Sequence, residues 1–544
     1  MQLYKEFCTE EFDEKGAVKK FELKYDDTFN FGYDVVDRLG KDDPDGRAVV
    51  WCNVKGDERI FTFKEISELS SKAANVFLEA GVQKGDRVMV ILKRNYEYWY
   101  VAPALHKIGA VIIPATNMLT TEDIMYRINS VDVKYAVITS ESEIPEKMGE
   151  AKKQCPSLKM IFGTGVQPEG VVNFTEAVAN AASVLERVET NVTEPMLLYF
   201  TSGTTGYPKA VTHNHTYPLA HIPTARYWQR VIDGGLHLTV AETGWAKASW
   251  GKIYGQWICG SAVMVYDFDT FAPKKILNVM AKHHVTTFCA PPTIYRCFTK
   301  CKLEKYDLSS LTHLTTAGEA INTVVIDNLY EQTGIKIAEG FGQSESVLMI
   351  GNLENDTPSP NSMGRPSPLY DIRLLKNDGT YASAGETGEI VVVPKDNQCG
   401  IFMDYYNNHE LYESVWEGGV YHTGDLAYFD DNNCYYYVSR KDDVIKSRGF
   451  RIGPFEIENK LMEHPAVMEC SVVGVPDKDR GQAVKASVVL AADYSPSDAL
   501  MREIKTTVNN SLAFYKHIHI LEFVDELPKT ISGKVRRTEL RANA

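Results

Sequence analysis

The chain has 544 residues, which is too many for one hydrophobic core, so at least two domains are expected. A hydrophobic fraction of 44% and a charged fraction of 24% are ordinary for a globular protein and exclude a disordered or fibrous chain. The formal net charge of -14 argues against a protein that coats nucleic acid or anionic membranes, because both surfaces attract basic proteins.

The targeting and cysteine patterns predict a cytoplasmic protein without a membrane span. Residues 1–16 contain neither a basic segment nor an apolar core, so no signal peptide is expected. The longest uncharged apolar stretch, residues 253–266, is shorter than the ~20 residues that a membrane helix needs. The 10 cysteines are scattered and match no common zinc-site spacing, which favours reduced, mostly buried thiols.

The first part of the chain alternates amphipathic segments with short apolar runs. Residues 66–80 have apolar side chains at helical spacing, and residues 87–92, 110–114 and 135–138 are predicted to be buried strands. This alternation predicts a largely parallel sheet with helices on both faces. The same pattern recurs over residues 231–314, so two doubly wound α/β subdomains are expected.

The pattern changes after about Met363. Predicted strands come closer together, and the turns at residues 377–379 and 430–433 carry Asp, Asn and Gly. This favours an antiparallel sheet or a small distorted β-barrel.

A charged segment, residues 439–443, precedes a third region of the chain. Beyond it we expect a helix at residues 456–464 and strands at residues 470–475 and 485–490. About one hundred residues suffice for a small α+β domain. The predicted domains are therefore residues 1–441 and 442–544.

The strongest chemical motif is the segment YFTSGTTGYPK, residues 199–209. An apolar strand leads into it from Met196, and its hydroxyls and glycines offer O–H and N–H donors that can surround phosphate oxygens. It is not a Walker A loop, because the lysine does not follow the second glycine and no Ser or Thr follows the lysine. Taken alone, it is equally consistent with a Ser/Thr-rich surface loop.

This motif resembles the signature of the adenylate-forming superfamily, which includes acyl-CoA synthetases, peptide-synthetase adenylation domains and luciferases. Six further segments match the signatures of that superfamily in the expected order. They are residues 317–320, 339–346, 385–390, 421–425, 440–446 and 528–534. The resemblance covers nearly the whole chain and is strongest to the medium-chain acyl-CoA synthetase branch. It implies a small mobile C-terminal domain that carries a catalytic lysine.

The resemblance also implies which residues bind ATP or AMP. They are Thr201, Ser202, Gly203, Thr204, Thr205, Gly206, Lys209, Gly318, Glu319, Ala320, Glu339, Gly340, Phe341, Gly342, Gln343, Ser344, Asp425, Arg440 and Lys534. Ser344 stands where threonine is usual in the family, but it keeps the hydroxyl that would contact phosphate. Thr201, Glu345 and Lys534 are the implied catalytic residues.

Each main role also has a chemical reason and an ordinary alternative. Glu345 would ligate Mg²⁺, since a hard oxygen ligand suits a hard cation; otherwise it is a solvated glutamate. Asp425 would accept hydrogen bonds from both ribose hydroxyls, and Arg440 would contact ribose or phosphate; otherwise they are a turn aspartate and a linker arginine. Lys534 would contact the reacting carboxylate and the bridging phosphate oxygen; otherwise it is a solvated tail lysine.

Three further residues are assigned to the movement of the small domain and to coenzyme A. Asp442 is the predicted hinge between the domains. Gly449 and Arg451 would line the tunnel for the pantetheine arm, although Gly449 could be only a turn glycine.

The acid pocket is predicted around Trp245 and Gly342. Adenylation domains that bind amino acids usually place an aspartate near position 245, and tryptophan here indicates an acid without an amino group. Trp250, Tyr254 and Trp257 follow closely, which favours a short- to medium-chain, branched or aromatic acid, unless these residues only pack the core.

The predicted function is an AMP-forming acyl-CoA synthetase that uses ATP, Mg²⁺ and coenzyme A. The acid and ATP would give acyl-AMP and pyrophosphate, and coenzyme A would then give acyl-CoA and AMP. Two alternatives stay open: a free-standing adenylating ligase with a carrier-protein acceptor, and a non-catalytic nucleotide-binding regulator. The expected partners are these small molecules, with no nucleic acid, and a homo-oligomer is allowed. His213 and His215 are expected to be loop histidines near the phosphate site rather than metal ligands.

Overall fold

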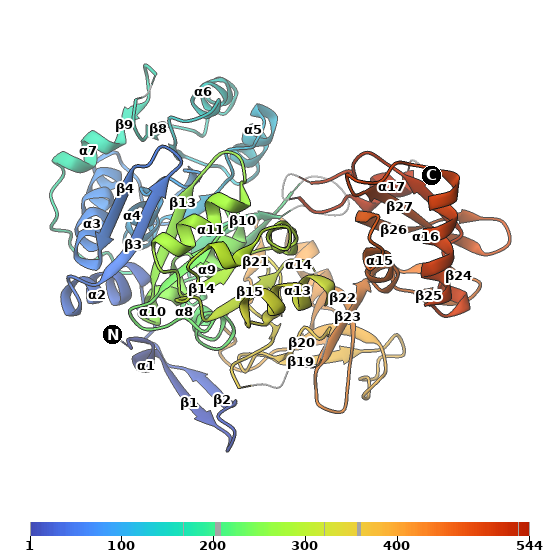
Figure 1. The fold of residues 1–544 in the computed structure, drawn as a ribbon. Helices are drawn as coiled ribbons and strands as arrows, with labels where there is room; N and C mark the ends of the chain where they lie inside the picture. Colours follow the sequence, from blue (N-terminus) through green and yellow to red (C-terminus); the bar gives the residue numbers. More distant parts are fainter. Residues whose placement is uncertain are drawn as a thin grey trace.

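The structure is a computed structural model that describes residues 2–166, 168–201, 208–319, 321, 323–355, 359, 361–530 and 533–542. Figure 1 shows a large body, coloured blue to orange, and a smaller red C-terminal part beside it. No helix in the described part of the chain combines the length and apolar character needed to cross a membrane.

The first large sheet has eight strands, and its central strands are parallel. Its core strands are buried along their whole length, which is typical of parallel sheets covered on both faces. In order across the sheet the strands are β21 (Asp404–Tyr405), β11 (Lys209–Asn214), β10 (Pro195–Thr201), β6 (Val111–Pro114), β5 (Arg87–Ile91), β7 (Tyr135–Ile138), β8 (Met160–Gly163) and β9 (Val172–Asn173). Its helices include α3 (Phe63–Glu79), α4 (Tyr98–Lys107), α5 (Thr121–Ser130), α6 (Ile144–Gln154) and α7 (Phe174–Asn180).

The second large sheet has nine strands and confirms the predicted repetition of the α/β pattern. Its strands in order are β18 (Arg365–Pro366), β17 (Ile350–Gly351), β16 (Ile337–Phe341), β15 (His313–Ala317), β14 (Thr287–Cys289), β12 (Leu236–Thr239), β13 (Ala262–Asp267), β3 (Arg47–Asn53) and β4 (Glu58–Thr62). Its helices include α8 (Tyr217–Pro223), the π-helix η2 (Thr224–Trp228), α9 (Ala246–Gly251), α10 (Tyr254–Ile258), α11 (Pro273–Lys282), α12 (Pro292–Phe298) and α13 (Thr323–Thr333).

An antiparallel sheet follows, as the closely spaced strands predict. Its order is β19 (Asp371–Leu375), β20 (Gly388–Val393), β22 (Tyr421–Phe429) and β23 (Tyr435–Arg440). Within the described residues no pairing joins β19 to β23, so this is an open sheet rather than a closed barrel. The helix α14 (His409–Val415) precedes β22.

The C-terminal part has a sheet and core of its own. Its core residues, among them Ile452, Ile457, Val484 and Ile504, form a cluster separate from the large domain. Its elements are β24 (Ile445–Ser447), β25 (Phe450–Ile452), α15 (Pro454–Met462), β26 (Val467–Asp477), β27 (Gly481–Leu490), α16 (Asp498–Asn510), the 3₁₀ turn η5 (Phe514–Lys516), β28 (Ile520–Phe523) and α17 (Arg537–Ala542). The strands pair in the order β25, β24, β27, β26, with β28 beside β27.

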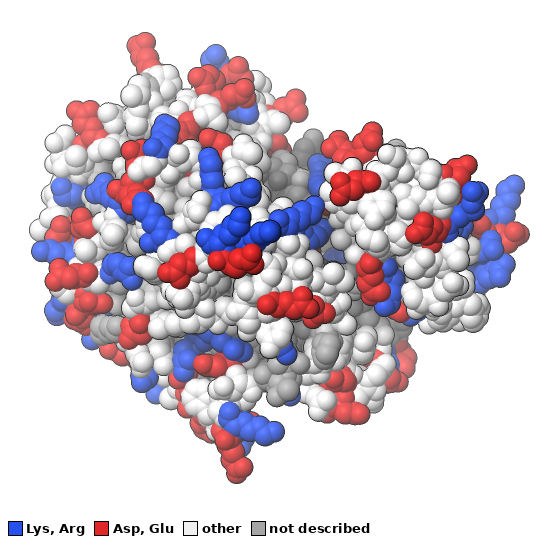
Figure 2. All heavy atoms as spheres, in the orientation of Figure 1, with Lys and Arg blue, Asp and Glu red and all other residues white. Residues whose placement is uncertain are grey.

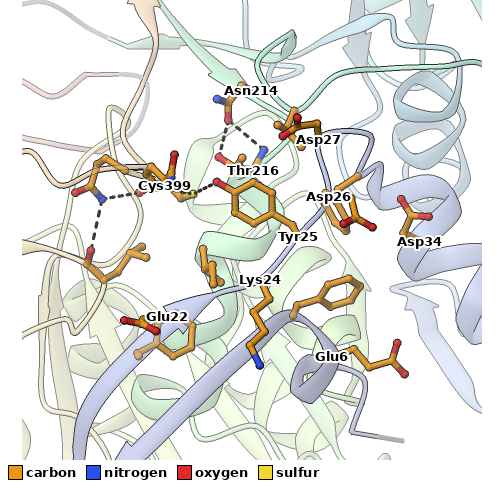
Figure 3. Close-up of a pocket in the computed structure, with 18 of the residues that line it drawn as sticks. Glu6, Glu22, Lys24, Tyr25, Asp26, Asp27, Asp34, Asn214, Thr216 and Cys399 are labelled. Carbon is orange, nitrogen blue, oxygen red and sulfur yellow. Dashed lines mark hydrogen bonds between the residues drawn. The ribbon is translucent and has the colours of Figure 1, made fainter.

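Near the N-terminus, α1 (Tyr4–Phe7) leads into a hairpin of β1 (Cys8–Phe12) and β2 (Val18–Leu23), which projects from the large body in Figure 1. A wide groove of about 1920 Å³ lies beside it, where the Tyr25 hydroxyl and the Cys399 thiol are 3.2 Å apart (Figure 3). None of the predicted site residues that the structure describes lines this groove. All 10 cysteines are free, and most are buried, as predicted.

Candidate functional site

The glycine- and hydroxyl-rich motif joins two paired strands. Thr201 ends β10 and lies directly opposite Lys209, which begins β11. The Lys209 ammonium is 5.3 Å from the centre of the Tyr405 ring. The predicted phosphate ligands between them, Ser202, Gly203, Thr204, Thr205 and Gly206, lie outside the described residues, as does Ala320. The motif is therefore the connection of an antiparallel hairpin at one end of the first sheet.

Gln343 links the segment after β16 to β22. Its Nε2 donates to Asp425 Oδ2 at 2.6 Å and to the Thr423 carbonyl at 2.8 Å. Its Oε1 accepts a hydrogen bond from the Tyr421 hydroxyl at 2.7 Å. One amide side chain thereby joins two of the predicted motifs, and both its nitrogen and its oxygen form hydrogen bonds.

Asp425 is almost completely buried, with 4% exposure. Burial raises the pKa of this carboxyl, and the positive charge of Arg440 opposes that rise. Arg440 Nη1 donates to Oδ2 at 3.1 Å, and the Tyr437 hydroxyl donates to Oδ1 at 3.1 Å. With Gln343, three donors hold a carboxylate that has about four acceptor positions, so about one position is left for a ribose hydroxyl.

Glu345 lies on the other side of the same segment. Its Oε1 accepts a hydrogen bond from the Tyr405 hydroxyl at 2.9 Å, and its backbone carbonyl accepts from the Phe402 N–H at 2.8 Å. Burial and the neighbouring Glu345 charge raise the pKa of Tyr405, so its hydroxyl stays a donor. The carboxylate is thereby oriented, and no described residue hydrogen-bonds its second oxygen.

This arrangement offers Mg²⁺ one oriented carboxylate. No group of three or more His, Cys, Asp or Glu side chains in the described parts of the chain could form a protein-only metal site. Mg²⁺ is commonly held by one or two carboxylates together with substrate phosphates and water. Glu345, fixed by Tyr405, can supply such a carboxylate.

Lys534 belongs to a short hairpin in which Lys529 and Val535 pair. Its backbone N–H donates to Thr530 Oγ1 at 3.1 Å, and its carbonyl accepts from the Thr530 N–H at 2.8 Å. The side chain is exposed on the small domain, and its charge helps to lower the pKa of Lys247 in the large domain. The predicted catalytic lysine is therefore near enough to the large domain for its charge to act there.

The predicted hinge residue, Asp442, is exposed and lies between β23 and β24, where the chain passes from one sheet to the next. Arg448 and Gly449 form the two-residue turn between β24 and β25, with φ values of 48° and 82°. Two positive φ values are typical of a type I′ turn, which explains the glycine. Arg451 is exposed on β25.

The aromatic residues of the predicted acid pocket have different positions. Trp245 is the N-cap residue of α9 and is half-buried. Trp250 packs on the backbone of Gly342, because a Cβ added there would lie only 2.4 Å from the Trp250 ring. Trp257 is a core residue whose indole N–H donates to the Ala48 carbonyl at 3.0 Å. Tyr254 is also in the core. Trp250 is also a core residue, at 5% exposure, so Trp245 is the half-buried member of the four.

Sequence reasoning missed Trp228 and placed His213 incorrectly. A Cβ at Gly340 would lie 2.6 Å from the Trp228 ring, so this indole packs directly on the β16 backbone. The glycine was the available signal, because a glycine within a strand often marks a close approach. His213 is a buried residue of β11 rather than a loop histidine, and its Nε2 lies 2.7 Å from the Ser344 carbonyl oxygen.

A buried polar face extends inward from this point along α8 and η2. Its members lie at helical spacing: Tyr217, His221, Thr224 and Trp228. Both His221 nitrogens, Thr224 Oγ1 and the Trp228 indole nitrogen are buried without a hydrogen-bond partner among the described residues, and the Tyr217 hydroxyl is buried beside the Trp250 indole. The centres of the Tyr217 and His213 rings are 4.2 Å apart. Because His213 contacts the Ser344 carbonyl, the polar face begins beside Ser344. Buried polar groups without partners are rare and call for an explanation.

Family models match both domains of the chain. A model described as AMP-binding enzyme matches residues 36–406, and one described as AMP-binding enzyme C-terminal domain matches residues 456–534. The chain belongs to the AMP-binding enzyme family.

Individual relatives agree along the whole chain. Acyl-coenzyme A synthetase ACSM3, mitochondrial, of Mus musculus is 38% identical over 555 residues, covering 99% of this chain and 95% of the relative. The enzyme of the same name from Homo sapiens is 39% identical, covering 96% of this chain and 90% of the relative. The predictions of an AMP-forming acyl-CoA synthetase and of its medium-chain branch are confirmed.

Solved structures confirm the fold. The anthranilate CoA ligase AuaEII in complex with anthranoyl-AMP has a TM-score of 0.87 and 26% identity, covering 96% of this chain and 98% of that chain. A benzoate CoA ligase from Burkholderia xenovorans LB400 has a TM-score of 0.82 at 23% identity, covering 94% of this chain and 100% of that chain.

The predicted cytoplasmic location is wrong. The relatives from Mus musculus and Homo sapiens are named mitochondrial enzymes. The prediction depended on the lack of an export signal and of a membrane-spanning stretch, and such a lack does not specify a compartment.

Proposed function

We propose that this acyl-CoA synthetase activates a short- to medium-chain, branched or aromatic acid, with Lys534, Glu345 and Asp425 in the roles that the family resemblance implies. The observation that carries this proposal is the hydrogen-bond network of Gln343, Asp425 and Arg440, which brings three of the predicted nucleotide motifs together. Adenylation joins two anions, a carboxylate and the α-phosphate of ATP, and a cation brought to that point offsets their repulsion.

The residues around the nucleotide hold it in a fixed position. Asp425 would accept a ribose hydroxyl while Gln343, Arg440 and Tyr437 keep its carboxylate in place. Glu345 would hold Mg²⁺, which supplies positive charge at the phosphates when bound. Lys534 would contact the carboxylate of the acid and the bridging phosphate oxygen. Figure 2 shows lysine and arginine side chains running across the visible face towards the junction of the two domains.

The small domain also offers a site for the nucleotide end of coenzyme A. A pocket of about 670 Å³ is lined by cationic side chains, including Arg448, Arg480 and Lys505, and by Phe450 and Phe514. Phe514 is 73% exposed, and Phe450 is 40% exposed. Exposed aromatic rings beside arginines suit an adenine base and phosphate groups.

This assignment is tested with coenzyme A and with dephospho-coenzyme A, which lacks the 3′-phosphate. Arg448→Ala should raise KM for coenzyme A about tenfold or more, because charge-assisted phosphate contacts are the stronger hydrogen bonds. It should leave pyrophosphate release unchanged, and it should abolish the preference for coenzyme A over dephospho-coenzyme A. An unchanged preference would place the nucleotide elsewhere.

The polar face on α8 and η2 is proposed to favour acids that carry a polar group. Tyr217, Thr224 and the Trp228 indole can all donate hydrogen bonds, and a pure hydrocarbon tail would leave them unpaired. An acid that carries a hydroxyl or carbonyl oxygen would satisfy them. Tyr217→Phe, which removes one hydroxyl, provides a matched variant.

The function is tested by pyrophosphate release with a panel of acids, with and without coenzyme A. Paired acids such as benzoate and 2-hydroxybenzoate, or butyrate and 3-hydroxybutyrate, report on the polar face. The oxygenated acid of each pair should have the higher kcat/KM in the wild type, and Tyr217→Phe should reduce that difference. If no acid releases pyrophosphate, the proposed function is wrong. If hydrocarbon acids are preferred, the function stands and only the proposed class of acid is wrong.

A further inference from the structure

Lys247 places an ammonium group of the large domain beside the segment predicted to contact the nucleotide. It lies two residues after Trp245, in the first turn of α9. Its Nζ donates a hydrogen bond to the carbonyl of Ala317, the last residue of β15. The same Nζ is 3.6 Å from the position that a Cβ on Gly318 would occupy. The ammonium therefore touches the segment predicted to contact the nucleotide.

This ammonium has no acidic partner of its own. No ion pair joins Lys247 to a carboxylate among the described residues, and the neighbouring Glu319 lies 3.9 Å from Arg296 instead. Only one of its three donors has a protein partner in the described part of the chain. The side chain is half-buried, so the remaining donors can reach a ligand.

The charge of Lys534 acts on Lys247 across the domain junction. Burial lowers the pKa of Lys247, and the charge of Lys534 lowers it further. Two ammonium groups repel each other, and an anion between them would offset that repulsion. The chemistry of the enzyme supplies two such anions, the carboxylate of the acid and the α-phosphate.

We propose that Lys247 is a second catalytic cation that contacts the reacting carboxylate and the α-phosphate during adenylation, and the phosphate of AMP when the thioester forms. This inference rests on the proposed function. In the first step a carboxylate oxygen bonds to the α-phosphorus, and the bond to pyrophosphate breaks. In the second step the sulfur of coenzyme A, having released its proton to solvent, bonds to the carbonyl carbon. The carbon–oxygen bond to phosphate breaks, and AMP leaves with the electron pair.

The two lysines differ in which domain carries them. Lys534 belongs to the small domain and would leave the centre if that domain rotated, whereas Lys247 would stay with the nucleotide segment. Loss of Lys534 should therefore affect adenylation alone. Loss of Lys247 should affect both steps, because developing negative charge on phosphate oxygens must be stabilised in each.

The test compares Lys247→Met, Lys247→Gln and Lys247→Arg with Lys274→Met, which removes one lysine charge from the surface of α11. Single-turnover pyrophosphate release measures adenylation, and coenzyme A consumption with supplied acyl-adenylate measures the second step. Lys247→Met and Lys247→Gln should each slow both steps by about 10²-fold, the loss typical of one transition-state contact. Lys247→Arg, which keeps the charge, should recover most of both rates.

Thermal unfolding separates chemistry from folding. Lys247→Gln can still donate to the Ala317 carbonyl, so it should unfold near the wild-type temperature even where Lys247→Met does not. The proposal is overturned if the folded Lys247→Gln variant equals Lys274→Met in both steps, or if it slows adenylation alone. A wild type that releases no pyrophosphate with any acid would overturn the proposed function instead.

Discussion

Asp425 and Arg440 lie directly opposite each other on β22 and β23, and their side chains form an ion pair of 3.1 Å. Arg440 Nε is also 3.6 Å from Asp442 Oδ1, at the predicted hinge. A single guanidinium thus lies between the predicted ribose ligand and the predicted hinge. Because Arg440 ends β23, a ligand that orders Asp425 also orders the start of the connection to the small domain.

Lys534→Ala should lose most adenylation while keeping thioester formation from supplied acyl-adenylate. Removal of one charged transition-state contact typically lowers the rate by ~10²–10³. Pyrophosphate release and coenzyme A consumption measure the two steps. Lys529→Ala is the matched control, since Lys529 belongs to the same hairpin but pairs with Glu469 at 2.9 Å. Unchanged pyrophosphate release in Lys534→Ala would show that the assigned role is wrong.

Asp442→Pro should trap one domain orientation. Proline fixes φ near −65° and restricts the residue before it, so a rotation about this position is blocked. Because the charge of Lys534 already acts on Lys247 of the large domain in this orientation, adenylation should persist while coenzyme A consumption stops. Asp442→Ala, which leaves the backbone free, should retain both activities. Equal loss of both steps in a folded Asp442→Pro protein would argue against a hinge here.

Trp245→Gly should move the preference towards longer acids. The indole is half-buried beside the site, and its removal makes room for several methylenes, each contributing about 0.8 kcal/mol when buried. We expect a changed ranking of kcat/KM over straight acids from acetate to decanoate, 2-methylbutyrate and benzoate, because one methylene changes selectivity only about 10- to 200-fold. A uniform fall with the ranking preserved would mean that Trp245 only supports the fold.

Glu339→Gln should flatten the pH dependence of stability. Burial raises the pKa of Glu339 to about 8, so the folded protein keeps this proton in a range where the unfolded chain has lost it. Stability is therefore lost as pH rises from the ordinary glutamate pKa towards 8, by at most about 1.4 kcal/mol per pH unit.

Urea unfolding at pH 5 and pH 8 measures this effect. The wild type should lose more unfolding free energy between the two values than Glu339→Gln. Glu331→Gln, at an exposed glutamate of α13, should behave like the wild type. Equal losses in wild type and Glu339→Gln would show that Glu339 is ionised in the folded protein.

Local patterns predicted the elements well, whereas contacts between distant residues could not be predicted. The strands at residues 87–92 and 135–138 match β5 and β7 within one residue, because continuous apolar runs report burial directly. The approach of Lys247 to Ala317, and of Trp228 to Gly340, depends on how α9 and η2 pack on the second sheet. Neither spacing nor composition encodes that packing, and only glycine at position 340 hinted at it.

Two arginines fasten the last helix to the residue beside the predicted hinge. Arg537 donates to Asp443 at 3.1 Å and to Glu458 at 2.8 Å, and Arg541 also pairs with Asp443. The hairpin of Lys534 precedes this anchor by three residues. A rotation at Asp442 would therefore move the hairpin that carries Lys534 together with the small domain. The position of the lysine would depend on the rotation angle more than on its side-chain rotamer. The first step would then be controlled by domain rotation, which moves the Lys534 ammonium away from the site without a change in its protonation.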